Sequence, residues 1–206
     1  MKELQQQFAL KLQQHWRNGD EIIFIDECSV HPWNTAGRKC WQRKDQSVFI
    51  KKDNYSQHSI SVQGAISNKR PGLLWQCSEG NNTDFFLLFL RKLLSWPFER
   101  HRTLIVLDLA TYHSSRRVKR WFDSHGISVL YLPPSSSELN PIEHCWAHVK
   151  ERIVLHMASQ PDRERHPDNF PRHVGRQLDL YSQGCGTQLA NSVLKQLLRV
   201  FRGHLL

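Results

Sequence analysis

The stretch LIVLDLATYH, residues 104–113, opens with a run of apolar residues and turns polar at Asp108. An earlier stretch, EIIFIDECS (21–29), has the same form and reaches Asp26. Short apolar runs of this length, bounded by polar residues, are typical of strands buried inside a sheet. The two stretches therefore predict two buried strands that each end at a carboxylate.

A third carboxylate follows in LPPSSSELNPIEHCWAHVK (132–150), where Asn-Pro opens a predicted helix and Glu143 falls in its first turn. Residues 109–142 separate Asp108 from Glu143, a spacing of 34. Carboxylate oxygens are ligands that Mg²⁺ prefers. Two such ions, about 3.5–4 Å apart, can activate the attacking oxygen and stabilise the leaving oxygen of a phosphodiester. Asp26, Asp108 and Glu143 are therefore predicted as catalytic residues and metal ligands.

These segments, IIFIDE (22–27), LIVLDLATYHSS (104–115) and residues 132–150, resemble the catalytic domain of the Tc1/mariner and IS630 superfamily of DDE transposases. The resemblance covers about residues 20–155, and its most specific part is SELNPIE with Trp146 and Lys150 behind it. It implies an RNase H-like fold and two Mg²⁺ ions, with Mn²⁺ as a substitute. The implied reaction is cleavage of a DNA strand by water, followed by attack of the freed 3′-hydroxyl on target DNA.

The resemblance also implies partners. Transposon ends and target DNA would be bound, and a homodimer is expected because this family handles two DNA ends together. Family members normally carry N-terminal helix-turn-helix modules that recognise the ends, but only 25 residues precede Asp26. We therefore expect specific end recognition to reside outside this chain.

Two departures from the family pattern keep alternatives open. Leu109 stands where the family usually has Asn, and Ser137 stands where a Pro usually precedes Glu138. Leu109 could loosen the hydrogen bonds that orient Asp108. One alternative is an inactive transposase remnant that binds DNA or a partner protein without cutting, and another is a nuclease that acts on RNA–DNA hybrids.

The charge of the chain favours nucleic acid as a partner. Its 206 residues carry 28 Lys and Arg against 19 Asp and Glu, which gives a net charge of +9. Such an excess attracts polyanions. The cations nearest the predicted carboxylates, with two Trp residues in a loop-rich stretch, are the candidate DNA contacts: Arg116, Arg117, Lys119, Arg120, Lys150, Trp33 and Trp41.

Other polar residues near the carboxylates have competing interpretations. His113 is predicted to support the site by approaching a phosphate or a metal-bound water, or else to cap a helix. Asn140 is predicted beside the site as well, although Asn followed by Pro is by itself an ordinary helix start. Glu143, His144, Cys145 and His148 also suggest zinc, but no further ligands stand at persuasive spacing.

The wider pattern predicts a mixed α/β domain. Apolar periodicity predicts strands at 22–25, 39–42, 59–66, 104–107 and 127–132, and helices at 4–16, 83–94, 116–125, 140–153 and 187–201. Three prolines and dense charge predict a loop over 158–173. We expect an N-terminal helix or linker (1–20), an RNase H-like domain with a mixed five-stranded sheet flanked by helices (21–155), and a charged loop with a C-terminal helix (156–206).

Cysteine spacing and hydropathy bound the compartment. Five cysteines form no C-x-x-C pair, which favours a reducing environment. No run approaches the roughly 18 apolar residues of a membrane helix, and the polar N-terminus lacks the core of a signal peptide. We expect a cytoplasmic protein that does not contact a membrane. If the source is prokaryotic, we expect it to associate with the nucleoid.

Overall fold

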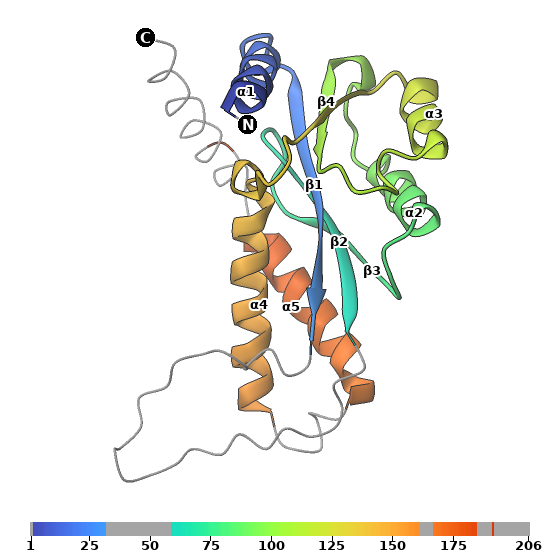
Figure 1. The fold of residues 1–206 in the computed structure, drawn as a ribbon. Helices are drawn as coiled ribbons and strands as arrows, with labels where there is room; N and C mark the ends of the chain where they lie inside the picture. The colour runs from blue at the N-terminus through green and yellow to red at the C-terminus, as the bar shows by residue number, and fades with distance from the viewer. Residues whose placement is uncertain (1, 32–58, 161–166, 185–190, 192–206) are drawn as a thin grey trace.

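A five-stranded sheet runs through the centre of the chain in the computed structural model, which describes residues 2–31, 59–160, 167–184 and 191 (Figure 1). The strands are β1 (Glu21–Val30), β2 (Ile60–Ser67), β3 (Leu74–Ser78), β4 (Thr103–Leu107) and β5 (Ser128–Tyr131). They lie in the order β3-β2-β1-β4-β5. β1 pairs antiparallel with β2 and parallel with β4, so the sheet is mixed, as predicted.

Four of the five strands fall where the apolar runs predicted them. The prediction missed β3, because LWQCS is short, only partly buried and lies at the edge of the sheet, where alternation is weak. The strand predicted at 39–42 lies outside the described residues.

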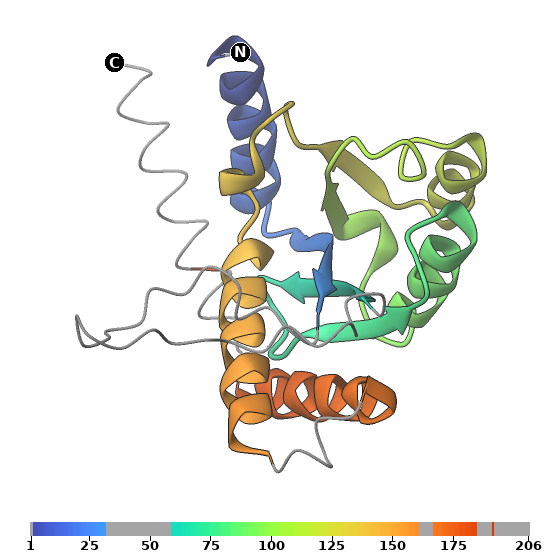
Figure 2. The ribbon, with the colours of Figure 1, turned by 60° about the horizontal axis from the view of Figure 1, so that its bottom comes forward.

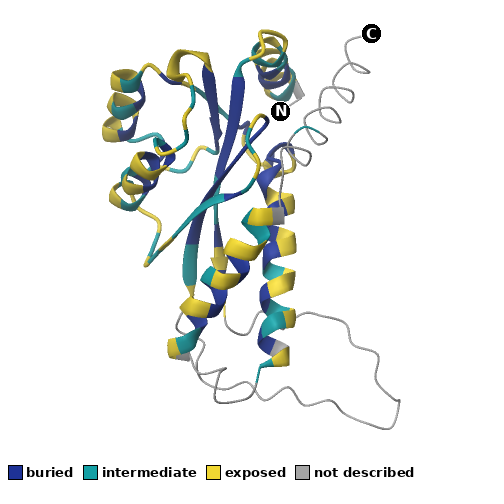
Figure 3. Ribbon diagram, turned by 180° about the vertical axis from the view of Figure 1, so that it is seen from behind, coloured by how far each residue is buried: buried dark blue, intermediate teal, exposed yellow. Residues whose placement is uncertain are grey.

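Two layers of helices cover the two faces of the sheet (Figure 2). The helices are α1 (Lys2–Arg17), α2 (Thr83–Leu93), α3 (Arg116–His125), α4 (Ile142–Ser159) and α5 (Phe170–Gly184). α1, α4 and α5 contribute to one apolar cluster with Phe24 and Val106, whereas α2 and α3 contribute to the other with Ile25 and Leu107. Figure 3 shows the buried sides of the helices turned toward the sheet. Because successive residues of a strand face opposite sides, β1 and β4 supply both clusters.

Local capping fixes the ends of α2 and α3. Ser115 caps α3 by accepting a hydrogen bond from Val118 N–H, and the helix ends at Gly126 in the left-handed conformation with φ 63°, as predicted. The side chain of Asn82, rather than Thr83 or Asp84, accepts hydrogen bonds from the first turn.

The predicted loop over 158–173 is wrong at its C-terminal end, where α5 begins at Phe170. Pro171 lies in the first turn of α5, where the missing N–H of proline costs nothing. Phe170, Val174 and Leu178 recur at four-residue spacing and are buried against the sheet. The described part of the predicted segment 156–206 thus completes α4 and adds a packed helix, while the helix predicted at 187–201 lies almost wholly outside the described residues. None of the helices in the described residues is long and apolar enough to cross a membrane.

Candidate active site

Neighbouring strands bring Asp26 and Asp108 to the same region of the sheet. β1 and β4 are parallel neighbours, with Phe24 paired to Val106. Continuing that register by two residues sets Asp26 opposite Asp108, and both side chains line one cavity of about 400 Å³. Asp108 directly follows β4, as predicted, but β1 continues beyond Asp26 to Val30, so the prediction that this strand ends at Asp26 is wrong.

Glu143 reaches the same cavity from the first turn of α4. The rest of the wall comes from the segments that follow β4 and β5. The cavity is lined by Asp26, Asp108, Leu109, Ala110, Leu132, Pro133, Pro134, Ser135, Ser136, Ser137, Asn140 and Glu143. All three predicted carboxylates thus share a cavity, although they come from distant parts of the sequence.

The pKa of Asp26 is raised by its surroundings in this cavity. Burial, followed by repulsion from Glu143, Glu27 and Asp108, raises the pKa of Asp26 from 3.8 to about 7. A carboxylate with so high a pKa gains most from a cation placed beside it, because the cation offsets both causes. Burial and the neighbouring carboxylates thus disfavour the charged form of Asp26, and a cation in the cavity would favour it.

Trp146 fixes the orientation of Asp26. Its indole Nε1 donates a hydrogen bond to Asp26 Oδ2 over 3.1 Å, and the ring is buried in the core between α4 and the sheet. The ring lies against Gly64 of β2, where a Cβ atom would stand 2.8 Å from Trp146 Cζ2. The sequence did not predict this hydrogen bond.

Asp108 is held by two hydrogen bonds. The N–H of Ala110 donates to Asp108 Oδ1 over 3.0 Å, and His113 Nδ1 lies 2.6 Å from the same oxygen. The hydrogen bond from His113 lowers the pKa of Asp108 more than partial burial raises it. Leu109 contributes neither bond, and its side chain is 52% exposed. The departure at Leu109 thus leaves these two bonds of Asp108 in place.

His113 is fully buried and contacts a second carboxylate besides Asp108, a partner that the prediction did not include. His113 Nε2 lies 3.0 Å from Glu27 Oε1, so the imidazole bridges two carboxylates. Burial lowers the pKa of His113, but its bonds to Asp108 and Glu27 outweigh that effect and raise the value to about 9. The sequence held a signal for Glu27. It shares a strand face with Ile23 and Ile25, and a charge on a buried face requires a partner.

Asn140 lies in the cavity wall and does not cap α4. It is 2% exposed, and its Oδ1 accepts no hydrogen bond from any atom that the structure describes. Only the backbone oxygen of Asn140 takes part in the helix start, by accepting from Glu143 N–H over 3.2 Å. A buried oxygen without a donor favours a ligand or water that can donate to it.

The side chains fit a hard divalent cation in donor chemistry. Three carboxylates and one buried amide oxygen offer only oxygen ligands, which suit Mg²⁺ and Mn²⁺ better than softer metals. Among the described residues, however, no three His, Cys, Asp or Glu side chains already converge at the spacing of a metal site.

The predicted DNA contacts fall on three parts of the chain. Arg116, Lys119 and Arg120 are exposed on α3, while Arg117 is ion-paired with Asp84 at 2.8 Å. Lys150 is partly buried on α4, and its charge lowers the pKa of Cys28 against the larger effect of burial. Trp33 and Trp41 lie outside the described residues.

The residues predicted for a zinc site do not converge in the structure. Cys145 is buried in the core beneath α4, whereas His144 and His148 are exposed. The His148 ring contacts Tyr181 of α5, with centroids 6.4 Å apart. These three side chains therefore face different surroundings.

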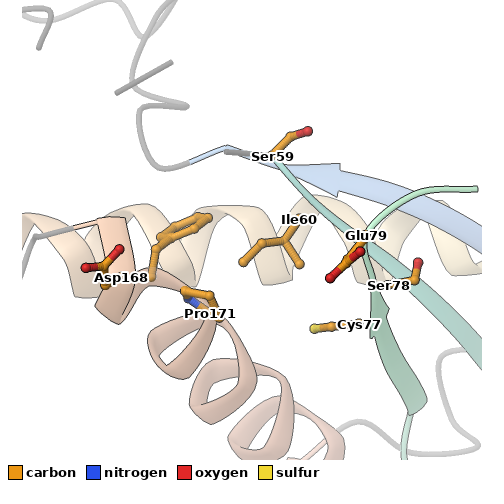
Figure 4. Close-up of a pocket in the computed structure, with 8 residues that line it drawn as sticks. Ser59, Ile60, Cys77, Ser78, Glu79, Asp168 and Pro171 are labelled. Atoms are coloured by element: carbon orange, nitrogen blue, oxygen red, sulfur yellow. The ribbon is translucent and has the colours of Figure 1, made fainter. Parts of the chain in front are cut away.

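A second cavity, of about 530 Å³, lies where β2 and β3 meet the start of α5 (Figure 4). Its described lining shares no residue with the carboxylate cavity and includes Ile60, Cys77, Glu79, Asp168 and Phe170. None of the predicted catalytic residues lies there, so its larger size does not make it the candidate active site.

Comparison with known proteins agrees with the carboxylate cavity. Residues 21–164 match the family described as DDE superfamily endonuclease. The chain is similar to the transposable element Tcb2 transposase of Caenorhabditis briggsae, with 42% identity over 151 residues, which are 68% of this chain and 55% of that protein. It is also similar to the Tc3 transposase of Caenorhabditis elegans, with 31% identity over 144 residues, which are 66% of this chain and 43% of that protein. The chain thus spans about half the length of these curated relatives.

Solved structures share the fold. The Mos1 mariner paired end complex with Mn matches with a TM-score of 0.68 and 16% identity, over 97% of this chain and 60% of that one. The Mos1 transposase catalytic domain with raltegravir and Mg matches with a TM-score of 0.63 and 15% identity, over 97% of this chain and 90% of that one. These likenesses confirm the predicted RNase H-like core. From the match over most of its length, the chain belongs to the DDE superfamily endonucleases, with Tc1/mariner transposases as its homologues.

Proposed function

We propose that this chain is the catalytic part of a Tc1/mariner-type transposase that cleaves DNA strands and transfers them to target DNA in a Mg²⁺-dependent reaction. The observation that carries the proposal is the shared cavity of Asp26, Asp108 and Glu143, in which burial and then repulsion between carboxylates raise the pKa of Asp26 to about 7. Mn²⁺ and Mg²⁺ appear with the Mos1 structures that share the fold, which supports the same ions here.

The residues in and beside the cavity would have separate roles in such a reaction. Asp26, Asp108 and Glu143 would hold two Mg²⁺ ions, which when bound would supply Lewis-acid activation of the attacking and leaving oxygens. Trp146 orients Asp26, and His113 orients Asp108. Hydrolysis of a phosphodiester would free a 3′-hydroxyl for attack on target DNA. Catalysis by this site would rest on position and electrostatics, without a covalent protein intermediate.

DNA is the proposed partner, bound chiefly through its phosphates. The exposed cations of α3 follow directly on the segment that carries Asp108 and His113, so a strand in the cavity would pass near them. A homodimer is proposed as well, since the related Mos1 structures include a paired end complex and a strand transfer complex.

Nicking of supercoiled plasmid at low salt, with Mg²⁺ or Mn²⁺, tests the proposal. Nicking should require the metal and disappear in Asp26→Asn, Asp108→Asn and Glu143→Gln, while DNA affinity stays largely unchanged. Glu138→Gln is the matched control, because Glu138 is an exposed carboxylate in the short helical turn before α4 and does not line the cavity. Nicking that persists in Asp108→Asn would overturn the assignment.

A binding-only role is the second candidate, and Leu109 favours it, since an exposed apolar side chain at the cavity differs from the family pattern. It predicts DNA binding without metal-dependent nicking, even when the DNA-recognition part of a relative is supplied in trans. A comparison of duplex DNA with RNA–DNA hybrid separates the hybrid nuclease from the transposase.

A further inference from the structure

His113 is immobilised from every side. The ring is fully buried, its two nitrogens lie 2.6 Å from Asp108 Oδ1 and 3.0 Å from Glu27 Oε1, and the Phe86 and Tyr112 rings pack on it with centroids 4.2 and 4.4 Å away. Ionised carboxylates only accept hydrogen bonds, so both nitrogens donate. An imidazole held in this way has no alternative rotamer.

The two carboxylates at its ends differ in their surroundings. The Glu27 side chain is only 6% exposed and lies on the face of β1 that packs on α2 and α3. The Asp108 side chain is 49% exposed and lies at the cavity. Packing therefore fixes Glu27, while Asp108 depends on its hydrogen bonds for a defined orientation.

We propose that Glu27 is a positioning residue of the metal site, which fixes the carboxylate of Asp108 through His113. The inference deepens the proposed function and rests on it. Asp26 and Glu27 are adjacent in β1 and face opposite sides of the sheet. β1 thus supplies one metal ligand, Asp26, directly. It also holds the second, Asp108, in place through the hydrogen bonds that His113 donates to Glu27 and to Asp108.

Three substitutions separate contact from charge. Glu27→Gln keeps a group that can bond His113 Nε2 in either protonation state but removes the charge. Glu27→Asp keeps the charge but withdraws the carboxylate by about 1.5 Å, the length of one carbon–carbon bond, which breaks the hydrogen bond to His113. Glu27→Ala removes both. Positioning predicts mild loss in the Gln variant and severe loss in the Asp and Ala variants.

The first measurement is Mn²⁺ affinity of the whole chain by calorimetric titration. Removal of a group that supports a metal ligand typically costs about 10–100-fold in affinity. We expect that loss in Glu27→Asp and Glu27→Ala, and less than about threefold in Glu27→Gln. If Glu27→Gln is as weak as Glu27→Ala while Glu27→Asp binds like the wild type, the charge of Glu27 matters rather than its hydrogen bond, and the proposal fails.

Glu21→Gln is the matched control for a general loss of stability. Glu21 is a buried carboxylate at the opposite end of β1, where it accepts hydrogen bonds from Ser67 and Arg70. Its substitution should lower the thermal midpoint and leave Mn²⁺ affinity unchanged. A parallel loss of affinity in Glu21→Gln would show that metal binding follows stability alone, which contradicts a positioning role.

A metal-free readout keeps this inference distinct from the proposed function. In the wild type, NMR should show the His113 Nδ1 proton protected from solvent exchange, and Glu27→Asp should expose it to exchange at least tenfold faster. Unchanged protection in Glu27→Asp would overturn the inference. If the wild type binds no Mn²⁺, the proposed function fails, and the exchange result alone decides whether Glu27 positions Asp108.

Discussion

Trp146 on α4 and Asp26 on β1 are joined by a hydrogen bond of 3.1 Å, from the indole Nε1 to Oδ2. The bond makes the core of the domain part of its cavity wall, because the same indole ring packs against Gly64 of β2. Any change that moves the ring therefore also releases the carboxylate.

Gly64→Ala should weaken the hydrogen bond between Trp146 and Asp26. Its Cβ would stand 2.8 Å from Trp146 Cζ2 and closer still to Cη2, so the ring or the strand must shift, and we expect the bond to Asp26 to be disturbed. Overpacking of this kind costs about 1–3 kcal/mol of stability, and we expect metal-dependent nicking to fall as well. Urea unfolding and plasmid nicking measure the two effects. Gly80→Ala is the control, since a Cβ there meets nothing within 4 Å; equal behaviour of the two variants would refute the coupling.

The raised pKa of Asp26 predicts that stability without metal depends on pH. Burial, then Glu143, Glu27 and Asp108, raise the pKa from 3.8 to about 7. The protonated form is favoured in the fold, so this contribution is present below about pH 4 and is lost as pH rises through about 7. Between pH 5 and pH 8, Asp26→Asn should gain on the order of 2 kcal/mol relative to the wild type, after discount for partial exposure.

Urea unfolding in EDTA at both pH values measures this difference. Millimolar Mg²⁺ at pH 8 should then stabilise the wild type and leave Asp26→Asn nearly unchanged. A difference between the two proteins that does not vary with pH would show that Asp26 is not perturbed in this way.

Asn140→Leu should reduce nicking without lowering the free energy of unfolding. Replacing a buried oxygen that lacks a donor among the described atoms by an apolar group of similar size should leave the free energy of unfolding unchanged or raise it by about 1 kcal/mol. Nicking should fall. Asn82→Ala is the opposite control, because it removes the cap of α2, costs about 1 kcal/mol and lies outside the cavity. Strong destabilisation by Asn140→Leu would indicate that Asn140 is structural.

DNA affinity should depend unequally on the cations of α3. Removal of one cation that binds a phosphate makes the plot of log affinity against log salt shallower by about 0.9. Arg116→Ala, Lys119→Ala and Arg120→Ala should each weaken binding to any duplex, whereas Arg117→Ala should matter less because Arg117 is paired with Asp84. Anisotropy titrations between 50 and 200 mM salt would test this, with exposed Arg100 at the opposite end of β4 as the control. Equal slopes for all variants would place the DNA elsewhere.

Local sequence determines the elements that hold the carboxylates. The apolar runs that precede Asp26 and Asp108 predict the two buried strands, although β1 continues beyond Asp26 to Val30. Glu143 follows from the Asn-Pro helix start, although the helix begins at Ile142, one residue later than expected. These features need no knowledge of tertiary contacts.

Contacts between distant segments were harder to predict. The bond from Trp146 to Asp26 depends on how closely α4 approaches the sheet at Gly64, and no residue spacing encodes that distance. β3 and α5 were missed for a related reason. An edge strand with mixed burial and a helix that opens with Phe-Pro acquire their stability from the surfaces they cover.

Because Asp26 and Glu27 face opposite sides of the sheet, the function of β1 depends on its exact register. A slip of one residue in this strand would point Glu27 into the cavity and Asp26 toward His113, and would turn every apolar side chain of the strand to the wrong helical layer. Deletions or insertions of a single codon between Glu21 and Glu27 should therefore destroy the fold and the site at once. Point substitutions at the cavity, by contrast, can silence the site in a chain that still folds.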